Sequence, residues 1–394
     1  MLEILITAFF SAGLWAFLVS LSVGVLLLLT TRWHGCYSFD LAQGIQAIHT
    51  KPIPRVGGIA IYLGVMVCYL FLTLRHGGVS VGGNSPQDFS LAKLVIPPAL
   101  LVRSPGALLP ILGLMLFAGL PAFLFGLVED LTKQVSVLVR LLATMISGGL
   151  ASVITGYHLT HLGLPGIDSI LLVAWVAIIF TAFAVGGVAN AINIIDGLNG
   201  LASAVLIVAF LGLASLAGVV GDISLVWVCV VMVCAVLGFF LLNWPFGKIF
   251  LGDGGSYFGG FALAWVCVLL VERNPQISPF ACLLICIYPV TEVLFSVYRR
   301  WVRKTRAGEP DRLHLHSLVH RRPLKKIRTF AGPLLSLGTI VPALAAYWLY
   351  PSTLYCILAC ALFVLVYIAV YARIVLHRWC SPLGFLLQQL PPRS

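Results

Sequence analysis

Apolar stretches of about 20 residues recur along the whole chain and restrict it to one kind of architecture. Hydrophobic residues make up 60% of the 394 positions and charged residues only 9%, and the mean hydropathy is +1.06. A soluble core cannot bury so much apolar surface, whereas a bilayer accepts it as helices whose backbone groups bond to one another. The sequence therefore predicts an all-α, polytopic membrane helix bundle that forms one integral-membrane domain over residues 1–394.

We expect eleven transmembrane helices. The first apolar run is too long for the core of a signal peptide and no basic residue precedes it, so it counts as a span. Pro97, Pro98 and Arg103 favour an interfacial position for residues 91–102, and the outer loop 77–88 carries no evident chemistry. The expected spans lie near residues 4–30, 56–74, 107–128, 136–156, 169–189, 201–220, 223–242, 256–271, 279–297, 330–350 and 353–372.

Basic residues gather on one side of these spans. Twenty of the 24 Lys and Arg residues fall there, and an excess of Lys and Arg marks the cytoplasmic side. We therefore expect the N-terminus outside and the C-terminus in the cytoplasm. The net charge of +11 is then a topology signal, and no nucleic-acid partner is expected. Eight of the ten cysteines lie inside apolar runs as small hydrophobes, which argues against a disulfide framework.

The most concentrated polar stretch, residues 190–200, closes one of the apolar runs. Asn190, Asn193 and Asp196 recur at every third position, so on a helix they share one face. These residues could simply solvate a helix end. An unpaired carboxylate beside hydrocarbon is costly, however, and such residues usually face a bundle interior or a water-filled cavity. We therefore interpret this stretch as part of a functional site.

The first two cytoplasmic loops carry charges at span ends. Lys51 and Arg55 precede a helix start and could grip an anionic ligand, although positive-inside anchoring explains them equally well. Glu129 and Asp130 are adjacent carboxylates that repel each other, so a divalent cation, a proton or a nearby lysine should accompany them. Either acid could act as a general base, although an acidic pair is also common on ordinary surfaces.

A glycine-rich turn surrounds Asp253, with Gly252, Gly254 and Gly255 beside it and Ser256 as an expected helix cap. Such a turn brings backbone N–H groups close to a ligand, and the helix N-terminus after it is an anion site. A carboxylate at this position suits Mg²⁺ that bridges to phosphate. Taken alone, a glycine-rich turn supports this interpretation only weakly.

The fifth cytoplasmic loop contains His314, His316 and His320. Zinc is one interpretation, but no cysteine lies nearby, and Mg²⁺ prefers oxygen ligands. We expect the histidines to donate hydrogen bonds to phosphates or to shuttle protons, while the surrounding basic residues also suit anionic lipid headgroups. Taken together, the loops favour Mg²⁺-dependent chemistry with phosphates.

Four motifs make the chain similar to a known family over about residues 49–316. They are Pro54-Arg55-Val56-Gly57-Gly58, residues 190–200, Phe250 to Ser256, and Asp311-Arg312-Leu313-His314-Leu315-His316. The chain resembles the polyprenyl-phosphate N-acetylhexosamine-1-phosphate transferases of glycosyltransferase family 4. The likeness is closest to the undecaprenyl-phosphate N-acetylglucosaminyl-1-phosphate transferase branch, because the muramoyl-pentapeptide branch usually carries three consecutive histidines in the fifth loop.

This resemblance implies transfer of a sugar-1-phosphate from a UDP-N-acetylhexosamine to polyprenyl (undecaprenyl) phosphate, with release of UMP. The product would begin a cell-envelope glycan such as the O-antigen of lipopolysaccharide. The resemblance further implies a multi-pass protein of the bacterial inner (plasma) membrane with a cytoplasmic active site and Mg²⁺, or Mn²⁺ in its place, as cofactor. The expected partners are the UDP-sugar, the polyprenyl phosphate and the membrane, and a homodimer is compatible with them.

The resemblance also implies roles for individual residues. The expected metal ligands are Asp253 and Asp196, and the expected catalytic residues are Glu129, Asp130, Asp196, His314 and His316. The expected substrate-binding residues are Lys51, Arg55, Asn190, Asn193, Asn199, Phe250 and Arg312. The chain departs from the family pattern at Glu129 and Glu292, where aspartate is usual, and at Ser317, where a histidine usually follows.

Two other interpretations remain open. The chain could be a transporter of an anionic solute with Asp196 and Glu292 in its gate, or an inactive family member that serves as a scaffold. Transporter folds usually show internal repeats and broken spans at the midplane, and the sequence gives neither signal. Metal-dependent release of UMP would separate the enzyme from both alternatives.

Overall fold

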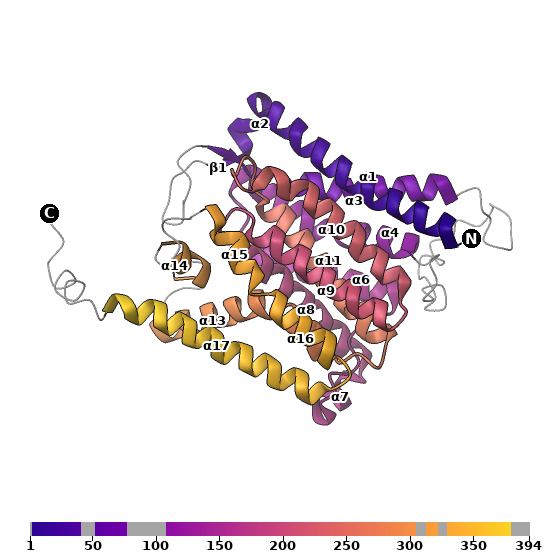
Figure 1. Cartoon of the computed structure of the whole chain (residues 1–394), viewed down its shortest axis with the longest axis vertical. Helices are drawn as coiled ribbons and strands as arrows, with labels where there is room; N and C mark the ends of the chain where they lie inside the picture. Colours follow the sequence, from indigo (N-terminus) through magenta and orange to yellow (C-terminus); the bar gives the residue numbers. More distant parts are fainter. Residues whose placement is uncertain (1, 41–51, 77–107, 305–312, 322–328, 380–394) are drawn as a thin grey trace.

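The computed structural model describes residues 2–40, 52–76, 108–304, 313–321 and 329–379, which form a bundle of helices (Figure 1). Two short strands, β1 (Phe39–Asp40) and β2 (Ile53–Pro54), pair antiparallel. The helices are α1 (Leu2–Leu29), α2 (Thr31–Ser38), α3 (Gly57–His76), α4 (Leu108–Ala118), α5 (Leu120–Thr132), α6 (Val137–Thr155), α7 (Pro165–Leu171), α8 (Ala174–Ile195), α9 (Leu201–Val219), α10 (Ile223–Asn243), α11 (Gly252–Arg273), α12 (Pro279–Ile285), α13 (Ile287–Arg303), α14 (Leu315–Arg321), α15 (Ala331–Leu337), α16 (Ile340–Leu349) and α17 (Thr353–Trp379).

These helices confirm the predicted polytopic membrane fold. Nine spans within the described residues are long and apolar enough to cross a bilayer, and the bent pairs α4–α5 and α12–α13 raise the number to eleven if each pair is one span. Each of the eleven overlaps one predicted span. The sidedness of the termini stays a prediction, and the stretches 77–88 and 91–102 lie outside the described residues.

The two bent pairs contradict the expectation that no span is broken. α4 meets α5 at 43°, and α12 meets α13 at 81°. Proline accounts for both, because its ring clashes with the carbonyl group four residues earlier and it lacks an N–H donor. Pro121 lies in the first turn of α5, and Pro289 lies in the first turn of α13, four residues after Ile285, the last residue of α12. Both prolines could have been recognised in the sequence as helix-breaking residues.

The helix α11 runs through the centre of the bundle, and nearly all of its residues are buried. Glycines let its N-terminal half approach its neighbours closely. A Cβ atom added at Gly58 of α3 would lie 2.2 Å from the backbone nitrogen of Gly255, and one at Gly126 of α5 would lie 2.6 Å from the carbonyl carbon of Asp253. Asp253 is therefore enclosed by the ends of α3 and α5.

The helix α13 has the polarity expected of a helix at the edge of a membrane bundle. Its buried face carries Glu292, Ser296 and Arg299, whereas Leu294 and Trp301 are exposed. In a bilayer the exposed apolar face meets lipid, and the polar face points into the protein. α17 packs against α12, α13 and α16 along the same side of the bundle (Figure 1).

Candidate active site

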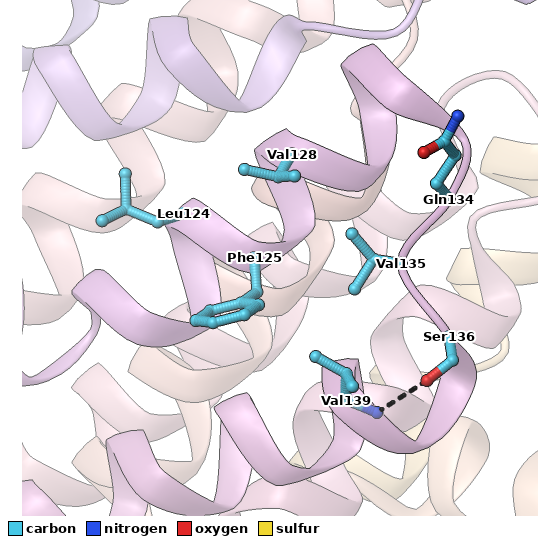
Figure 2. Close-up of a pocket in the computed structure, with 7 residues that line it drawn as sticks. All are labelled: Leu124, Phe125, Val128, Gln134, Val135, Ser136 and Val139. Carbon is cyan, nitrogen blue, oxygen red and sulfur yellow. Dashed lines mark hydrogen bonds between the residues drawn. The ribbon is translucent and has the colours of Figure 1, made fainter.

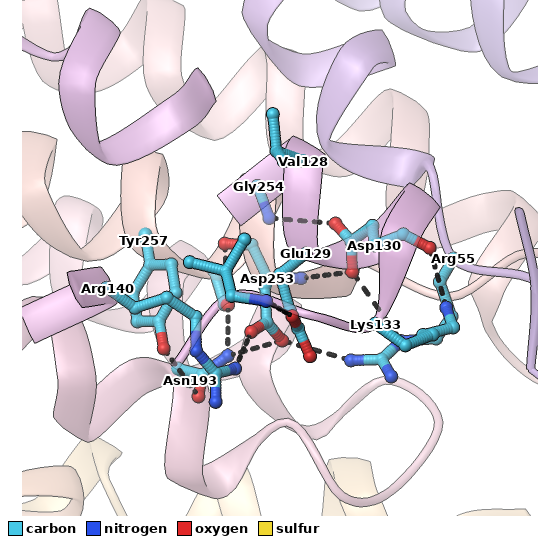
Figure 3. Close-up of polar contacts among 12 residues, drawn as sticks. Arg55, Val128, Glu129, Asp130, Lys133, Arg140, Asn193, Asp253, Gly254 and Tyr257 are labelled. Carbon is cyan, nitrogen blue, oxygen red and sulfur yellow. Dashed lines mark hydrogen bonds and ion pairs between the residues drawn. The ribbon is translucent and has the colours of Figure 1, made fainter. Parts of the chain in front are cut away.

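Charged side chains from different helices converge at the N-terminus of α11 (Figure 3). We call this group the carboxylate cluster. It consists of Arg55, Asp130, Arg140, Asn193, Asp196 and Asp253. Arg55 precedes α3, Asp130 lies in the last turn of α5, and Arg140 lies in the first turn of α6. Asn193 lies in the last turn of α8, Asp196 follows that helix, and Asp253 lies in the first turn of α11. The fold thus joins residues up to 198 positions apart in one site.

Asp253 is the centre of this cluster and is only 3% exposed. Its Oδ1 atom accepts hydrogen bonds from Arg55 Nη2 at 3.0 Å and from Asn193 Nδ2 at 3.0 Å. Arg140 forms an ion pair with the other oxygen. Two guanidinium groups and one amide therefore offset the charge of this buried carboxylate, which would otherwise be strongly unfavourable.

Arg140 is the functional residue that the sequence interpretation missed. It lies near the start of α6, whose N-cap is Ser136. A cation near a helix N-terminus opposes the helix dipole, so an arginine there needs a carboxylate partner. That unfavourable position, in a chain with only 13 acidic residues, was the available signal. The partner itself, Asp253, is 113 residues further along the chain.

Asp130 holds the start of α11 rather than facing an open site. Its Oδ1 accepts the backbone N–H of Asp253 at 2.8 Å, and its Oδ2 accepts the N–H of Gly254 at 2.9 Å. Gly252 is essential to this contact, because its φ is +74° and a Cβ atom there would lie 2.5 Å from Asp130 Oδ2. The predicted open anion cradle is therefore wrong for these two N–H groups, since a protein carboxylate already occupies them.

Two further expectations about these loops also change. Ser256 does not cap α11, because the helix begins at Gly252 and the Ser256 hydroxyl accepts a hydrogen bond from Asn193 Nδ2 at 2.9 Å. Glu129 does not face Asp130, since Glu129 Oε2 accepts the backbone N–H of Val135 at 2.7 Å. The adjacent acids therefore diverge to separate N–H partners, and the expected nearby lysine is Lys133, whose Nζ donates to the Asp130 carbonyl oxygen at 2.6 Å. The catalytic roles of Glu129 and Asp130 stay predictions.

Asp196 is the member of the cluster that occupies the first position after α8. The backbone N–H of Gly252 bonds to its carboxylate. Burial and the neighbouring carboxylates of Asp253 and Asp130 raise the pKa of Asp196 well above its usual range, while Arg55 acts in the opposite direction. Asp196 and Asp253 thus interact, as the family resemblance implied, while their role as metal ligands stays a prediction.

The other predicted substrate-binding residues lie in different surroundings. Asn190 ties α8 to α6, because its Nδ2 donates to Thr144 Oγ1 at 3.0 Å and to the Gly186 carbonyl at 2.8 Å. Asn199 packs against Gly247, and Phe250 accepts the N–H of Gly57 on its carbonyl at 2.9 Å. Lys51 and Arg312 lie outside the described residues. Substrate binding by all of these stays a prediction.

A second group, which we call the histidine cluster, consists of Glu292, His314, His316 and Tyr367. His314 Nδ1 lies 3.0 Å from Glu292 Oε1, and the two imidazole rings stack with centroids 5.4 Å apart. The His316 ring lies against Gly197, where a Cβ atom would approach Nε2 to 2.6 Å. The two clusters therefore meet next to Asp196.

His316 is neutral at pH 7. Burial lowers its pKa to about 4, Glu292 opposes this shift, and the neighbouring His314, His320 and Arg321 add to it. Its Nδ1 atom is buried and has no hydrogen-bond partner among the described residues. A buried polar atom without a partner is unfavourable, so this atom is suited to a ligand or a water molecule. Such a ring can donate to or accept from a phosphate without adding a charge.

The carboxylates of the cluster fit a Mg²⁺ site with only one or two protein ligands. Among the described residues, no group of three or more His, Cys, Asp or Glu side chains could hold a metal ion. Mg²⁺ is often bound by one or two carboxylates, with waters and substrate phosphates as the other ligands. Asp196 and Asp253 match that pattern, although an ion on Asp253 would share its oxygens with Arg55, Arg140 and Asn193.

An apolar cavity of about 390 Å³ lies between α5 and α6 (Figure 2). It is lined by Leu124, Phe125, Val128, Gln134, Val135, Ser136 and Val139. Most of the apolar side chains in this group are exposed, and exposed apolar residues of a membrane protein face lipid. The carboxylate cluster thus lies next to a surface that suits hydrocarbon chains.

The bundle and its two polar clusters define an integral membrane protein with a buried charged site at one end of its central helix. The sequence model of the family described as Glycosyl transferase family 4 matches residues 112–271. Over these residues the chain is similar to this family, in agreement with the resemblance drawn from the motifs. The matched region contains Asp130, Arg140, Asn193, Asp196 and Asp253, whereas the histidine cluster lies beyond it.

Curated relatives are similar to part of the chain. A protein of Pasteurella multocida (strain Pm70) is 30% identical over 115 residues, 28% of this chain and 32% of its own length. One of Haemophilus influenzae is 30% identical over 168 residues, which are 40% of this chain and 46% of the relative. One of Escherichia coli (strain K12) is 32% identical over 106 residues, which are 26% of this chain and 29% of the relative. Each is named undecaprenyl-phosphate alpha-N-acetylglucosaminyl 1-phosphate transferase. The chain spans less than half the length of these relatives.

Proposed function

We propose that this protein transfers an N-acetylhexosamine-1-phosphate from a UDP-sugar to a polyprenyl phosphate and releases UMP. The observation that best supports this proposal is that Asp196 and Asp253 lie beside two arginines at one end of a membrane helix bundle. The names of the relatives support the same reaction. We further propose that this end faces the cytoplasm of a bacterial inner membrane, with the N-terminus outside and the C-terminus inside.

The arginines address the main difficulty of this reaction, which is that two polyanions must meet. Arg55 and Arg140 lie within reach of a phosphate bound beside Asp253 and can exchange a protein carboxylate for phosphoryl oxygens. Positioning and electrostatic stabilisation are the main contributions of proteins to phosphoryl transfer. Mg²⁺, which Asp196 and Asp253 would hold, supplies further positive charge to the phosphoryl oxygens when bound.

The acceptor needs little chemical activation. A phosphate monoester titrates near pH 6, so most of it is a dianion at pH 7 and attacks without losing a proton. Asp130 is poorly placed as a general base, because both of its oxygens bond to the backbone of α11. Glu129 keeps one oxygen outside its bond to Val135 and is the better candidate if a base takes part.

The histidine cluster is a second source of contacts to the substrate phosphates. Glu292 fixes the orientation of His314, and neutral His316 lies against the turn that follows α8. Imidazole groups held this way can donate hydrogen bonds to phosphoryl oxygens. The loss of a third imidazole at Ser317, which is buried beside His316, leaves room for a small polar group and is a candidate determinant of sugar preference.

A transporter of an anionic solute is the second candidate, because broken spans are typical of transporters and two occur here. The 81° bend at Cys286 has another consequence, however, since it turns α13 so that Glu292 reaches His314. Proteoliposomes loaded with labelled solute test this alternative. Solute uptake without any lipid-linked product would favour the transporter.

The direct test of the proposal is the formation of a lipid-linked sugar. Membranes that contain the protein are incubated with undecaprenyl phosphate, Mg²⁺ and one labelled UDP-sugar at a time, and the lipids are extracted. We expect label in the lipid fraction with UDP-N-acetylglucosamine or a related UDP-N-acetylhexosamine, and none with the Asp253→Asn variant. No labelled lipid with any UDP-N-acetylhexosamine would contradict the proposal.

A further inference from the structure

Glu292 is a fully buried carboxylate, with 0% exposure, in a helix that faces lipid on its other side. Both of its oxygens accept hydrogen bonds. Oε1 accepts from the His314 ring and from the backbone N–H of Leu315 at 2.9 Å, and Oε2 accepts from the Tyr367 hydroxyl at 2.9 Å. A buried charge requires such partners, so each of these groups helps to fix the carboxylate in one orientation.

The carboxylate in turn fixes His314. An ionised carboxylate only accepts hydrogen bonds, so the contact at 3.0 Å places a proton on Nδ1 of His314, which donates it to Glu292. Nε2 is then the ring nitrogen left to meet a ligand, and the stacking of the ring on His316 limits its rotation. The tautomer and the direction of the ring therefore both depend on Glu292.

Tyr367 is the outermost member of this chain of contacts and comes from α17, beyond the region that matches the family. It is 4% exposed, and its ring packs edge-on against Phe295 at 5.6 Å between centroids and beside Tyr371 at 6.4 Å. A hydroxyl buried at membrane depth is costly unless it is bonded. These neighbours hold the Tyr367 ring in place, so its hydroxyl keeps its contact with Glu292.

We propose that Tyr367 is a positioning residue for the proposed transfer reaction, acting through Glu292 to hold the His314 ring in its working orientation. It touches neither substrate nor metal in this scheme. The inference rests on the proposed function, since it assigns Tyr367 a role in the rate of that reaction. It gives the last transmembrane helix a part in the site, although its other large side chains mostly face outward.

The test compares two matched variants on the same helix. Tyr367→Phe removes only the hydroxyl that contacts Glu292, and Tyr371→Phe removes a hydroxyl one turn later that contacts Arg299 at 3.5 Å. Both are purified in detergent and assayed below their unfolding temperatures with the UDP-sugar that the wild type accepts. We expect Tyr367→Phe to lower kcat about tenfold with KM for the UDP-sugar changed less than about twofold, and Tyr371→Phe to stay near the wild type.

A second background separates positioning from general packing. In a His314→Ala protein the ring that Tyr367 orients is gone, so adding Tyr367→Phe should lower the residual rate no further. Three outcomes would each overturn this inference but leave the proposed function intact. They are a wild-type kcat in Tyr367→Phe, an equal loss of kcat in Tyr371→Phe, and a further tenfold loss when Tyr367→Phe is added to His314→Ala. A wild-type protein that transfers no sugar-phosphate would instead overturn the proposed function, and this inference with it.

Discussion

The carboxylate cluster and the histidine cluster balance their buried charges in different ways. Asp253 is paired with two cationic guanidinium groups, whereas Glu292 is bonded to an imidazole, a backbone N–H and a phenol hydroxyl. In the first arrangement, the guanidinium groups of Arg55 and Arg140 can also bind a phosphate. The second fixes the direction of one ring. We infer that the first cluster supplies electrostatic stabilisation and the second supplies orientation, and the variants below test that division.

The largest effect is expected from removing the central charge. Asp253→Asn keeps the shape of the side chain but loses the charge that faces Arg55 and Arg140, and we expect turnover to fall about a thousandfold. The protein should stay folded in detergent, because both arginines are partly exposed and can reach water. Asp168→Asn, in the short helix α7 that precedes α8, is the control and should retain full activity. Near-normal activity of Asp253→Asn across Mg²⁺ concentrations would show that the metal assignment is wrong.

Arg140 gives the next largest effect, because it is the cation that the cluster contributes from α6. Arg140→Gln should lower kcat about a hundredfold, and Arg140→Lys should recover part of it, since lysine keeps the charge but not the planar fork. Arg75→Gln on α3 removes an exposed arginine that donates to Ser11 Oγ at 3.3 Å and serves as the control. A hundredfold rise in KM at unchanged kcat would mean that Arg140 only binds the ground state.

Asp130 should affect stability more than chemistry. Asp130→Asn leaves one of the two N–H groups at the start of α11 facing an amide nitrogen, which should reduce the free energy of unfolding by about 1–3 kcal/mol. The change is measured as a lower unfolding temperature in detergent. Glu129→Gln, next to it in sequence, should leave the unfolding temperature nearly unchanged. Loss of activity in Asp130→Asn with unchanged stability would instead place Asp130 in the chemistry.

The smallest effect concerns pH and the histidine cluster. The pKa of His316 is lowered to about 4 by burial, so between about pH 6.5 and pH 4 the unfolded chain binds a proton at this ring that the folded chain does not. Stability contributed by the neutral ring is therefore lost as the pH falls through this window, by about 1 kcal/mol between pH 6.5 and 5.5. His316→Gln should flatten that slope in a thermal unfolding series. An unchanged slope would show that the ring is not neutral in the folded protein.

The sequence was sufficient for what depends on local pattern. Apolar run length predicted the spans, and the motifs, through the family resemblance, implied that Asp196 and Asp253 lie close together. Contacts between distant segments were out of reach. Nothing near Gly254 in sequence indicates that its N–H is bonded to Asp130, 124 positions earlier.

The missed features differ in how visible they were. Pro121 and Pro289 were sufficient to predict the two bends, because a proline cannot continue a helix unbroken. Tyr367 could not have been selected, since an aromatic residue within an apolar helix is usually part of the packing. Its contact with Glu292, 75 positions away, exists only because α12 and α13 are bent at Cys286 and α17 returns along them.

The most direct measurement of the central claim is the identity of the released nucleotide. Cleavage between the two phosphates leaves UMP, whereas transfer of the sugar alone leaves UDP. Arginines and carboxylates around a phosphate suit charge that develops on phosphoryl oxygens, while an oxocarbenium ion calls for a different arrangement near the sugar ring. We therefore predict UMP, formed only when a divalent cation and polyprenyl phosphate are both present, and reversal when UMP is added to the lipid product. Chromatography that found UDP in its place would contradict the account.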